Sequence, residues 1–341
     1  MEVSPPEPRT PAIPSPDTRT LLLRALIESR PEYLSGNLVA TRFGLSRVAI
    51  WNHIEQLNLE GYRIHAIRNR GYLLQAEPEV LHEAGLRAHA GKLGMVPRIY
   101  YHDQIDSTNS EVDRLLNEDV AMPFAVLAKG QSKGRGRRGN QWFSSSAGNL
   151  YVSFGFDPNL EIARMGHYTL WVGFCVCKYL RQQYGCECRI KWPNDLYLEG
   201  RKLAGILTEA KIETDRIRRL IVGLGMNVNG DAAQFPDHLK DRVVSLREAL
   251  GHAVPFNECA AAILQVVFEA SERYFREDIR EALRSEWAEY DYLYGRKVLA
   301  VGTLETVSGV ACGIDASGHL RIRQSDESVV TVHSGEVTLS L

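Results

Sequence analysis

The sequence predicts a multidomain α/β protein, and three changes of pattern along its 341 residues are the basis for this. Apolar residues recur at helical spacing from residue 18 to about residue 61, and a hairpin-like segment follows. Strand-like and helix-like segments then alternate over residues 86–288, which is typical of an α/β layer fold. Residues 295–341 contain only short strands separated by turns. We therefore expect a small helical domain, a central α/β domain and a small antiparallel β-barrel.

The composition is that of an ordinary globular protein, with 44% apolar and 24% charged residues. The net charge of −2 provides no overall attraction to nucleic acid or membrane, so any such binding must come from local patches. No apolar run approaches the roughly 20 residues that span a bilayer, and the N-terminus does not resemble a secretory signal. Six cysteines are too few for a disulfide scaffold. We expect a cytoplasmic protein with reduced thiols and no membrane partner.

Residues 18–77 predict a winged helix-turn-helix domain, preceded by a tail. Residues 1–17 contain six prolines and few apolar residues, so we expect them to be disordered or extended. A first helix is expected over residues 21–27, and Ser35 and Ser46 are candidate N-caps of a second and a third helix. Gly44 provides the turn between these two helices, and residues 64–74 predict a β-hairpin, the wing.

The third helix and the tip of the hairpin are the candidate DNA contacts, because such helices enter grooves and cationic wing tips touch phosphates. Residues 1–77 contain nine arginines and eight acidic residues, so the domain is only weakly basic. Phosphate contacts usually dominate affinity, which leaves a small helical domain without a DNA role as the alternative. Residues 75–81 would link to the next domain. The candidate DNA-binding residues are Arg47, Trp51, Asn52, Arg68 and Arg70.

Residues 129–142 concentrate cations and glycines in one loop. Five cationic side chains occur among these 14 residues with no acid between them, and four glycines break any regular periodicity. Glycine lets backbone N–H groups approach a ligand, and arginine offers a planar fork of donors to carboxylate and phosphate oxygens. We expect an anion-binding loop that is mobile until its anion arrives. Nonspecific nucleic-acid binding and a solvated loop are the alternatives. The cations are Lys129, Lys133, Arg135, Arg137 and Arg138.

Three further features of the central domain carry chemistry. Residues 106–109 open a helix, and spacing alone favours helix capping over ligand binding for their side chains. Lys191 is an isolated cation beside Trp192, among mostly apolar neighbours, and a buried lysine needs an anionic partner. Gly223 and Gly225 lie in a predicted strand, where glycine suggests close approach of a ligand or another backbone. Residues 230–243 predict a long flexible connection.

The cysteines and the C-terminal strands show no chemistry by sequence. The two C-x-C pairs, Cys175/Cys177 and Cys186/Cys188, do not have the spacing of a zinc site, and small buried hydrophobes are the better interpretation. The ten histidines form no ligand cluster in the sequence, so no metal site built from protein ligands alone is expected.

Four motifs, in order, resemble those of biotin–protein ligases. From residue 18 to the C-terminus the chain resembles the bifunctional bacterial type. That type has a winged helix-turn-helix, a ligase domain with a mixed, class II synthetase-like sheet and an SH3-like barrel. The motifs are Gly134-Arg-Gly-Arg-Arg-Gly139 with Trp142, Lys191-Trp-Pro-Asn-Asp195, Lys202-Leu-Ala-Gly-Ile-Leu-Thr-Glu209 and Gly223-Leu-Gly-Met-Asn227.

The resemblance implies a two-step reaction with biotin, ATP and Mg²⁺. Biotin would first be activated to biotinyl-5′-AMP and then transferred to a lysine of the biotin carboxyl carrier protein of acetyl-CoA carboxylase. It further implies repression of biotin operon DNA by a homodimer that forms when the adenylate is bound. Two alternatives remain open: a regulator that only senses biotin or its adenylate, and a ligase for a related acid such as lipoate.

Site residues carry over motif by motif. Lys191, Arg135 and Arg137 would be catalytic. Ser107, Thr108, Asn109 and Gln131 would contact the ureido end of biotin, and the remaining biotin contacts would be Arg135, Gly136, Arg137, Lys191 and Gly205. The nucleotide contacts would be Arg137, Arg138, Lys191, Asn227, Asn229 and Phe235, with residues 229–243 covering adenine.

Two positions depart from the family pattern. Asn140 stands where the family loop often has another basic residue, so one phosphate or packing contact could be missing. Trp51-Asn52 stands where repressors of the family often have smaller or more basic residues, which leaves the operator sequence open.

Overall fold

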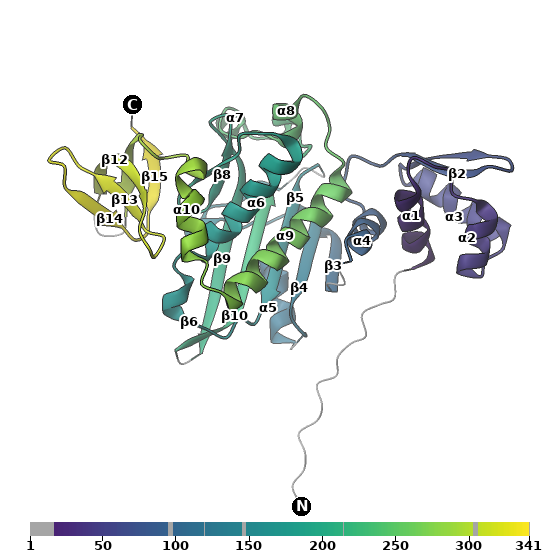
Figure 1. The fold of residues 1–341 in the computed structure, drawn as a ribbon, viewed down its shortest axis with the longest axis horizontal. Coiled ribbons are helices and arrows are strands. Elements are labelled where there is room, and N and C mark those ends of the chain that lie inside the picture. Colours follow the sequence, from purple (N-terminus) through teal and green to yellow (C-terminus); the bar gives the residue numbers. More distant parts are fainter. Residues whose placement is uncertain are drawn as a thin grey trace, which may run out of the picture.

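The computed structural model describes residues 17–94, 98–118, 120–144, 148–213, 215–302 and 306–340. Figure 1 shows three parts in a row, with the N-terminal helical domain at the right, the central sheet in the middle and the C-terminal strands at the left. The expected fold class is confirmed in all three parts. The expected disordered tail lies, apart from Asp17, outside the described residues.

The N-terminal domain is a helix-turn-helix followed by a hairpin, as predicted. The Asp17 side chain accepts a hydrogen bond from the backbone N–H of Thr20, and Ser46 accepts one from Ala49, so both first turns are capped. Gly44 ends the second helix at a φ of 63°, a left-handed conformation that suits glycine. Ser35 occupies the N-cap position but makes no cap bond. The elements are α1 (Thr18–Ser29), α2 (Gly36–Phe43), α3 (Arg47–Leu59), β1 (Arg63–Ile67) and β2 (Gly71–Ala76).

Helix α4 (Glu83–Lys92) joins the N-terminal and central domains, because it packs against both α1 and α9. Its residues Ala84 and Ala88 belong to the N-terminal hydrophobic core, whereas Leu86 and Ala90 belong to the central core. At its start, the buried Asn257 of α9 accepts a hydrogen bond of 2.8 Å from the backbone N–H of His82. The junction is therefore a packed interface. The domain boundaries drawn from the sequence stay predictions.

Glu77 connects the two sides of this junction through a buried carboxylate. Its Oε2 lies 2.8 Å from Nε2 of His89, and its Oε1 accepts a hydrogen bond of 3.0 Å from Arg30. Burial is the largest single influence and raises the pKa of Glu77. The hydrogen bond and charge of His89, together with the charge of Arg30, outweigh it and lower the pKa below its ordinary value of 4.5.

We predict that Glu77→Gln lowers the free energy of unfolding at pH 7 by about 1–3 kcal/mol, because it removes a charged acceptor from buried donors. A lowered pKa in the folded state stabilises the fold above the ordinary value of 4.5, and this contribution disappears as the pH falls through the folded-state pKa. The difference in urea unfolding between wild type and variant should therefore shrink below about pH 4.5.

The matched control is Glu83→Gln. Glu83 pairs with Arg87 on the surface of α4, so it should change stability by less than about 1 kcal/mol. Equal effects of the two substitutions, or a Glu77 effect that does not change with pH, would contradict the role of Glu77.

The central domain is built on a mixed sheet with the strand order β3-β4-β5-β10-β9-β8-β7, and β6 pairs with β10 beside this path. Only β3 and β4 are parallel among the described pairs. The strands are β3 (Arg98–Ile105), β4 (Phe124–Gln131), β5 (Leu150–Phe156), β6 (Leu160–Glu161), β7 (Arg189–Lys191), β8 (Asp195–Leu198), β9 (Arg201–Glu213) and β10 (Arg216–Met226).

Helices cover both faces of the sheet. In β4, Phe124 and Val126 pack with α5 (Thr108–Asn117), whereas Ala125 and Leu127 belong to the larger core under α6 (Tyr168–Tyr184) and α9 (Phe256–Arg276). Figure 1 shows α6 and α9 crossing one face of the sheet, with α5 behind it. The chain continues through α10 (Arg280–Tyr290) to the C-terminal strands.

One expectation for the central domain needs correction. The stretch 230–243, expected to be irregular, contains the 3₁₀ turn η3 (Ala232–Gln234) and α7 (Asp237–Lys240), and α8 (Leu246–Leu250) follows. Helix α6 begins at Tyr168 and follows the 3₁₀ turn η2 (Ile162–Met165). The predicted alternation of strands and helices over residues 86–288 is confirmed.

The C-terminal domain is a five-stranded antiparallel sheet with the order β14-β13-β12-β11-β15. Alternate residues, such as Val298 and Ala300 in β11, are buried and belong with Val337 of β15 to the same hydrophobic core as the central sheet. The strands are β11 (Lys297–Val301), β12 (Thr306–Ile314), β13 (Leu320–Arg323), β14 (Val329–Val332) and β15 (Glu336–Leu339).

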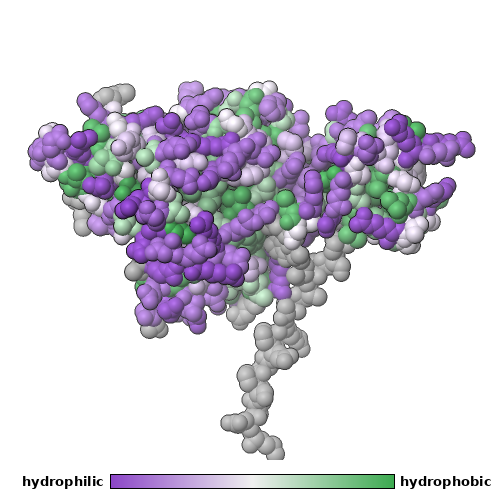
Figure 2. Space-filling view, viewed as in Figure 1, coloured by the Kyte–Doolittle hydropathy of each residue, from purple (hydrophilic) through white to green (hydrophobic). Residues whose placement is uncertain are grey.

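The molecular surface in Figure 2 mixes hydrophilic and hydrophobic atoms, without a continuous apolar belt on the face shown. Among the described residues, no helix combines the length and the apolar character needed to cross a bilayer. The six cysteines are free thiols, and four of them (Cys177, Cys186, Cys188 and Cys259) are buried, as expected for small hydrophobes.

Candidate active site

A cavity of about 910 Å³ opens between the loop after β4, the β7–β8 hairpin, the strands β9 and β10 and the C-terminal strand β15. This volume suits a ligand of drug-like or nucleotide size. All residues that the sequence assigned to biotin line it: Ser107, Thr108, Asn109, Gln131, Arg135, Gly136, Arg137, Lys191 and Gly205.

The start of α5 contributes a network of buried neutral polar groups. The backbone N–H and Oγ1 of Thr108 donate to Oε1 of Gln131 over 2.8 and 3.1 Å. Nδ2 of Asn109 donates to Glu209 over 2.8 Å, and the Ser153 hydroxyl lies 2.5 Å from Oδ1 of Asn109. Ser107 occupies the N-cap position without a side-chain cap bond, so the capping expectation is wrong. These side chains instead present donors and acceptors to the cavity.

The loop of residues 132–142 is folded back on itself. The backbone N–H of Trp142 donates to Gly134 over 2.9 Å, and that of Gly136 donates to Asn140 over 2.7 Å. Between these bonds lies the 3₁₀ turn η1 (Arg137–Gly139). Apart from this short turn the segment has no helix or strand, as its glycines predicted, and its mobility without ligand stays a prediction. Asn140, the departure from the family pattern, closes this turn through its backbone and lines the cavity.

Three of the five loop cations line the cavity. Arg135 pairs with Glu209 over 2.5 Å, and Arg137 donates to Oδ1 of Asn194 over 3.1 Å. Lys129 instead pairs with Asp103 over 2.8 Å, away from the cavity. Burial and then the neighbouring Arg138 lower the pKa of Arg137, although a guanidinium remains charged near neutral pH. Two adjacent cations with little carboxylate compensation favour binding of an anion.

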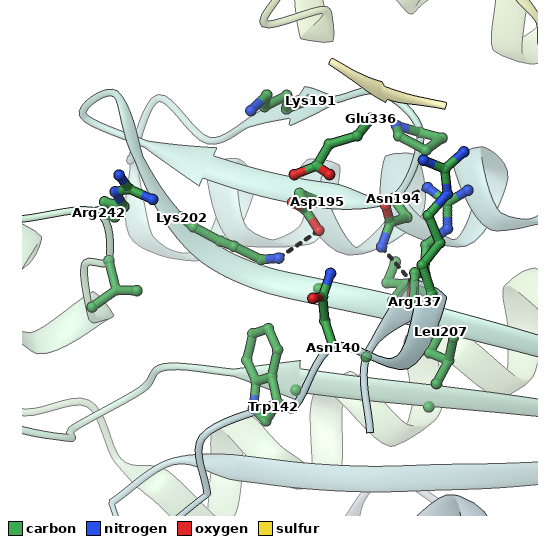
Figure 3. Close-up of a pocket in the computed structure, with 18 of the residues that line it drawn as sticks. Arg137, Asn140, Trp142, Lys191, Asn194, Asp195, Lys202, Leu207, Arg242 and Glu336 are labelled. Carbon is green, nitrogen blue, oxygen red and sulfur yellow. Dashed lines mark hydrogen bonds and ion pairs between the residues drawn. The ribbon is translucent and has the colours of Figure 1, made fainter. Parts of the chain in front are cut away.

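Lys191 is half-buried rather than fully buried, which corrects the expectation of an apolar environment. Its Nζ donates to the hydroxyl of Tyr197 over 3.2 Å and lies 5.0 Å from the centroid of that ring. Within the described part of the chain it has no carboxylate partner. Figure 3 shows Lys191 and Arg137 on separate sides of the cavity, so a ligand between them would meet a cation from each side.

The Trp142 indole packs directly on two glycines of the sheet. A Cβ atom at Gly225 would lie 2.4 Å from this ring, and one at Gly205 would lie 2.9 Å from it. The indole N–H is buried without a hydrogen-bond partner among the described residues. Lys202 lies over the ring, with its Nζ 5.2 Å from the ring centroid, and pairs with Asp195 over 2.8 Å (Figure 3). The group that closely approaches Gly225 is therefore the Trp142 side chain, and not a ligand or another backbone as predicted.

Comparison with known proteins covers all three domains. Residues 101–227 match the biotin/lipoate A/B protein ligase family, residues 18–73 an HTH domain and residues 295–340 the biotin protein ligase C-terminal domain. Bifunctional ligase/repressor BirA of Bacillus subtilis is 32% identical over 328 residues, which cover 94% of this chain and 99% of that protein. The chain belongs to the bifunctional ligase/repressor family.

Two further relatives support this membership. BirA of Escherichia coli is 31% identical over 327 residues, which cover 95% of this chain and 98% of that protein. The structure of biotin protein ligase from Aquifex aeolicus in complex with biotin and ATP superimposes with a TM-score of 0.61 at 27% identity. The match covers 71% of this chain and 99% of that one.

Three candidate nucleotide residues of this family member do not line the cavity. Asn227 donates to the backbone of Val244, and Asn229 exchanges two hydrogen bonds with the backbone of Val254. Phe235 is buried against Phe143, with ring centroids 5.4 Å apart. In this conformation Asn227 and Asn229 hold the 227–254 segment together and Phe235 packs it against Phe143, and their contact with nucleotide stays a prediction.

Sequence reasoning missed several residues that line the cavity. Trp142, Lys202 and Asp195 each belong to one of the family motifs, although no role was assigned to them. Membership of these motifs was the signal that could have identified them. Glu336 of β15 had no such signal, because no chemistry was expected in the C-terminal domain. Figure 3 shows the Glu336 carboxylate facing the cavity, where its charge raises the pKa of Arg137 against the larger effect of burial.

We predict that Gly223→Ala destabilises the ligase/repressor chain by about 1–3 kcal/mol through overpacking. A Cβ atom there would lie 2.2 Å from Oδ1 of Asn109, whose amide is fixed by Glu209 and Ser153. The control is Gly173→Ala in α6, where the nearest contact of 3.5 Å is ordinary. Thermal unfolding should show a lower melting temperature for Gly223→Ala but not for Gly173→Ala. Equal melting temperatures for Gly223→Ala and wild type would contradict the tight contact.

Proposed function

We propose that the chain is an ATP-dependent biotin–protein ligase that forms biotinyl-5′-AMP and transfers biotin to a lysine of the biotin carboxyl carrier protein. The single observation that carries this proposal is the polarity of the cavity. Neutral donors and acceptors line one end, and along the rest the cationic side chains outnumber the carboxylates of Asp195, Asp241 and Glu336. This order fits a molecule with a neutral, hydrogen-bonding head and an anionic end that must meet a phosphate.

The neutral end favours a ureido head group over a dithiolane. Thr108, Asn109 and Gln131 offer amide and hydroxyl groups that can both donate to and accept from a cyclic urea. A dithiolane ring has no N–H or C=O groups, so it could not exchange hydrogen bonds with these polar side chains as a urea could. Biotin is therefore the proposed substrate in preference to lipoate.

The cationic part brings two anions together. In the first step a carboxylate oxygen of biotin attacks the α-phosphorus of ATP, the bond to the bridging oxygen breaks and pyrophosphate leaves. Arg135, Arg137 and Lys191 would hold the carboxylate and the phosphate oxygens, and their positive charge would stabilise the charge that builds up. In the second step the amine of the carrier lysine attacks the acyl carbon, and AMP leaves.

Mg²⁺ fits this site chiefly through the nucleotide. No group of three or more His, Cys, Asp or Glu side chains that could hold a metal ion occurs among the residues the structure describes. Asp195 or Glu336 could each supply one carboxylate oxygen to an ion held mainly by phosphates. When bound, Mg²⁺ would neutralise charge on the phosphate oxygens.

We predict that Lys191→Ala lowers the rate of adenylate formation by about 100-fold or more, because a cation opposite Arg137 is lost. Formation of adenylate and biotin transfer to a purified carrier domain can be measured separately. Lys240→Ala is the control, since Lys240 pairs with Asp237 on α7 and does not line the cavity. An unchanged rate in Lys191→Ala would contradict the assigned role. A wild-type chain that never labels the carrier would favour a pure sensor.

The second proposed function is repression of biotin biosynthesis genes through DNA binding. Arg47, Trp51 and Asn52 lie on the exposed side of α3, and Arg68 and Arg70 flank the tip of the hairpin. Part of this surface is already organised, because the Arg70 guanidinium carbon lies 4.4 Å from the centroid of the Tyr33 ring.

We predict that the chain with biotin and ATP retards DNA from upstream of its own biotin genes in a mobility-shift assay. Arg68→Ala should weaken binding to all sequences and reduce the salt dependence of the affinity, since phosphate contacts carry no sequence information. Trp51→Ala should instead change the preference between sequences. No shift with or without the substrates would contradict the repressor role.

Homodimerisation is proposed through an open strand edge. β8 pairs with β9 only over residues 201–205, whereas β10 pairs with β9 as far as Glu213. Beyond Ile206 the outer edge of β9 therefore has no strand partner among the described residues, and its Ile212 is 53% exposed. Such an edge can pair with a second copy.

We predict that Ile212→Asp weakens dimerisation of the adenylate-bound chain by about tenfold, because a charge replaces an apolar contact at the edge. Sedimentation velocity over a concentration series measures this. Ile162→Asp is the control, since Ile162 is similarly exposed, at 47%, but lies outside β9. Unchanged dimerisation in Ile212→Asp would place the interface elsewhere.

The proposed location is the cytoplasm. The free thiols and the ATP requirement both agree with a reducing, nucleotide-containing compartment.

A further inference from the structure

A second cavity of about 380 Å³ adjoins the first, and nothing in the proposed roles above uses it. Arg137, Arg138 and Asn194 line both cavities, so the loop arginines stand between them. The outer wall comes from two distant parts of the chain. One is the start of α6, with Thr169, and the other is the C-terminal domain, with His333.

The second cavity is electropositive. Its lining contains two arginines, one histidine and two threonines but no Asp or Glu, whereas Asp195, Asp241 and Glu336 line the main cavity. The Oγ1 atoms of Thr169 and Thr208 lie 2.9 Å apart, and this bond uses only one of the two hydroxyl protons. The other proton is available to a ligand oxygen. This set of groups matches a small, highly charged oxyanion.

Arg138 supports the same assignment by an independent feature. Its backbone has a φ of 54°, a left-handed conformation that is uncommon for residues other than glycine. Its guanidinium has no hydrogen-bond or ion-pair partner within the described ranges, unlike Arg135 and Arg137. Arg138 thus combines an unusual backbone conformation with a guanidinium that is available to bind a ligand in either cavity.

The backbone at the start of α6 adds donors to the same wall. This 17-residue helix begins at Tyr168, and its N-cap residue His167 makes no side-chain cap bond. The first N–H groups of a helix have no partner within it, and they favour negative charge. Gly166, Thr169 and Leu170 of this helix start line the cavity.

We propose that the second cavity binds the pyrophosphate that leaves in adenylate formation, and that the C-terminal domain contributes to this site through His333. The proposal rests on the proposed ligase function. When the carboxylate oxygen bonds to the α-phosphorus, the electron pair of the broken P–O bond stays with pyrophosphate. Pyrophosphate leaves from the side of the phosphorus opposite the attacking carboxylate and needs cations there. Arg137 and Arg138 line both cavities, so they can contact the phosphates before and after the bond breaks.

The same charge argues against the carrier lysine as the occupant. A lysine ammonium would meet two guanidinium groups with no carboxylate to balance them, which disfavours its entry. An inorganic anion with several negative charges instead gains a charge-assisted bond from each arginine.

The test is the reverse reaction of the full chain, in which inorganic pyrophosphate and the bound biotinyl adenylate give ATP. His333→Glu places a carboxylate at the exposed rim of the cavity, and Thr169→Asp places one on its inner wall. Each should raise the KM for pyrophosphate by about tenfold through repulsion. Biotin affinity without nucleotide should stay within about twofold. Ser328→Glu, an exposed position of the same domain outside the cavity, is the control.

The outcomes separate the two proposals. A raised KM for pyrophosphate in both cavity variants, with Ser328→Glu like wild type, supports the site. An unchanged KM in His333→Glu, which is exposed and should fold, overturns it while leaving the ligase function intact. A raised KM for the carrier protein alone would assign the cavity to the carrier and overturn the pyrophosphate site. A wild-type chain that forms no adenylate from biotin and ATP contradicts the proposed function and this inference together.

Discussion

The Glu209 carboxylate on β9 is the interaction on which the site depends. Its Oε1 accepts from Arg135 of the loop over 2.5 Å, and its Oε2 accepts from Asn109 of α5 over 2.8 Å. One side chain therefore fixes both the arginine-containing loop of residues 132–142 and the neutral end of the cavity relative to the sheet. It is half-buried, and a charge in that position needs partners. Arg135 supplies the opposite charge, which an incoming carboxylate or phosphate would compete for.

Three glycines of the sheet, which have no side chains, make room for Asn109 and Trp142 in the cavity wall. Gly223 lies under Asn109, and Gly225 and Gly205 lie under the Trp142 indole, so each side chain rests directly on backbone. These close contacts fix the polar side chains that would bind the neutral head of the ligand. Charge is less compensated toward Arg137 and Arg138, where the reacting anions would meet. A fixed neutral end and an unsatisfied cationic end give one cavity the two properties that acid activation requires.

The three-part fold and most of the site could be predicted from the sequence, because local patterns carry them. Periodicity located α1, α3 and the strands, and the glycine-arginine motif indicated the loop whose arginines line the cavity. The errors concern contacts between distant residues. Spacing could not show that Asn109 would bond Glu209 rather than cap α5, or that Lys129 would turn to Asp103. Nor could it show that β15 would close the cavity, since that depends on how the domains pack.

Calorimetric titration of biotin into the Glu209→Gln chain tests this dependence most directly. The amide removes the charge that holds Arg135 and one acceptor of the Asn109 network, while the size of the side chain is kept. Biotin should bind at least about tenfold more weakly than to wild type, whereas Glu213→Gln at the exposed end of the same strand should bind like wild type. Biotin affinity equal to wild type in Glu209→Gln would contradict the central place given to this carboxylate.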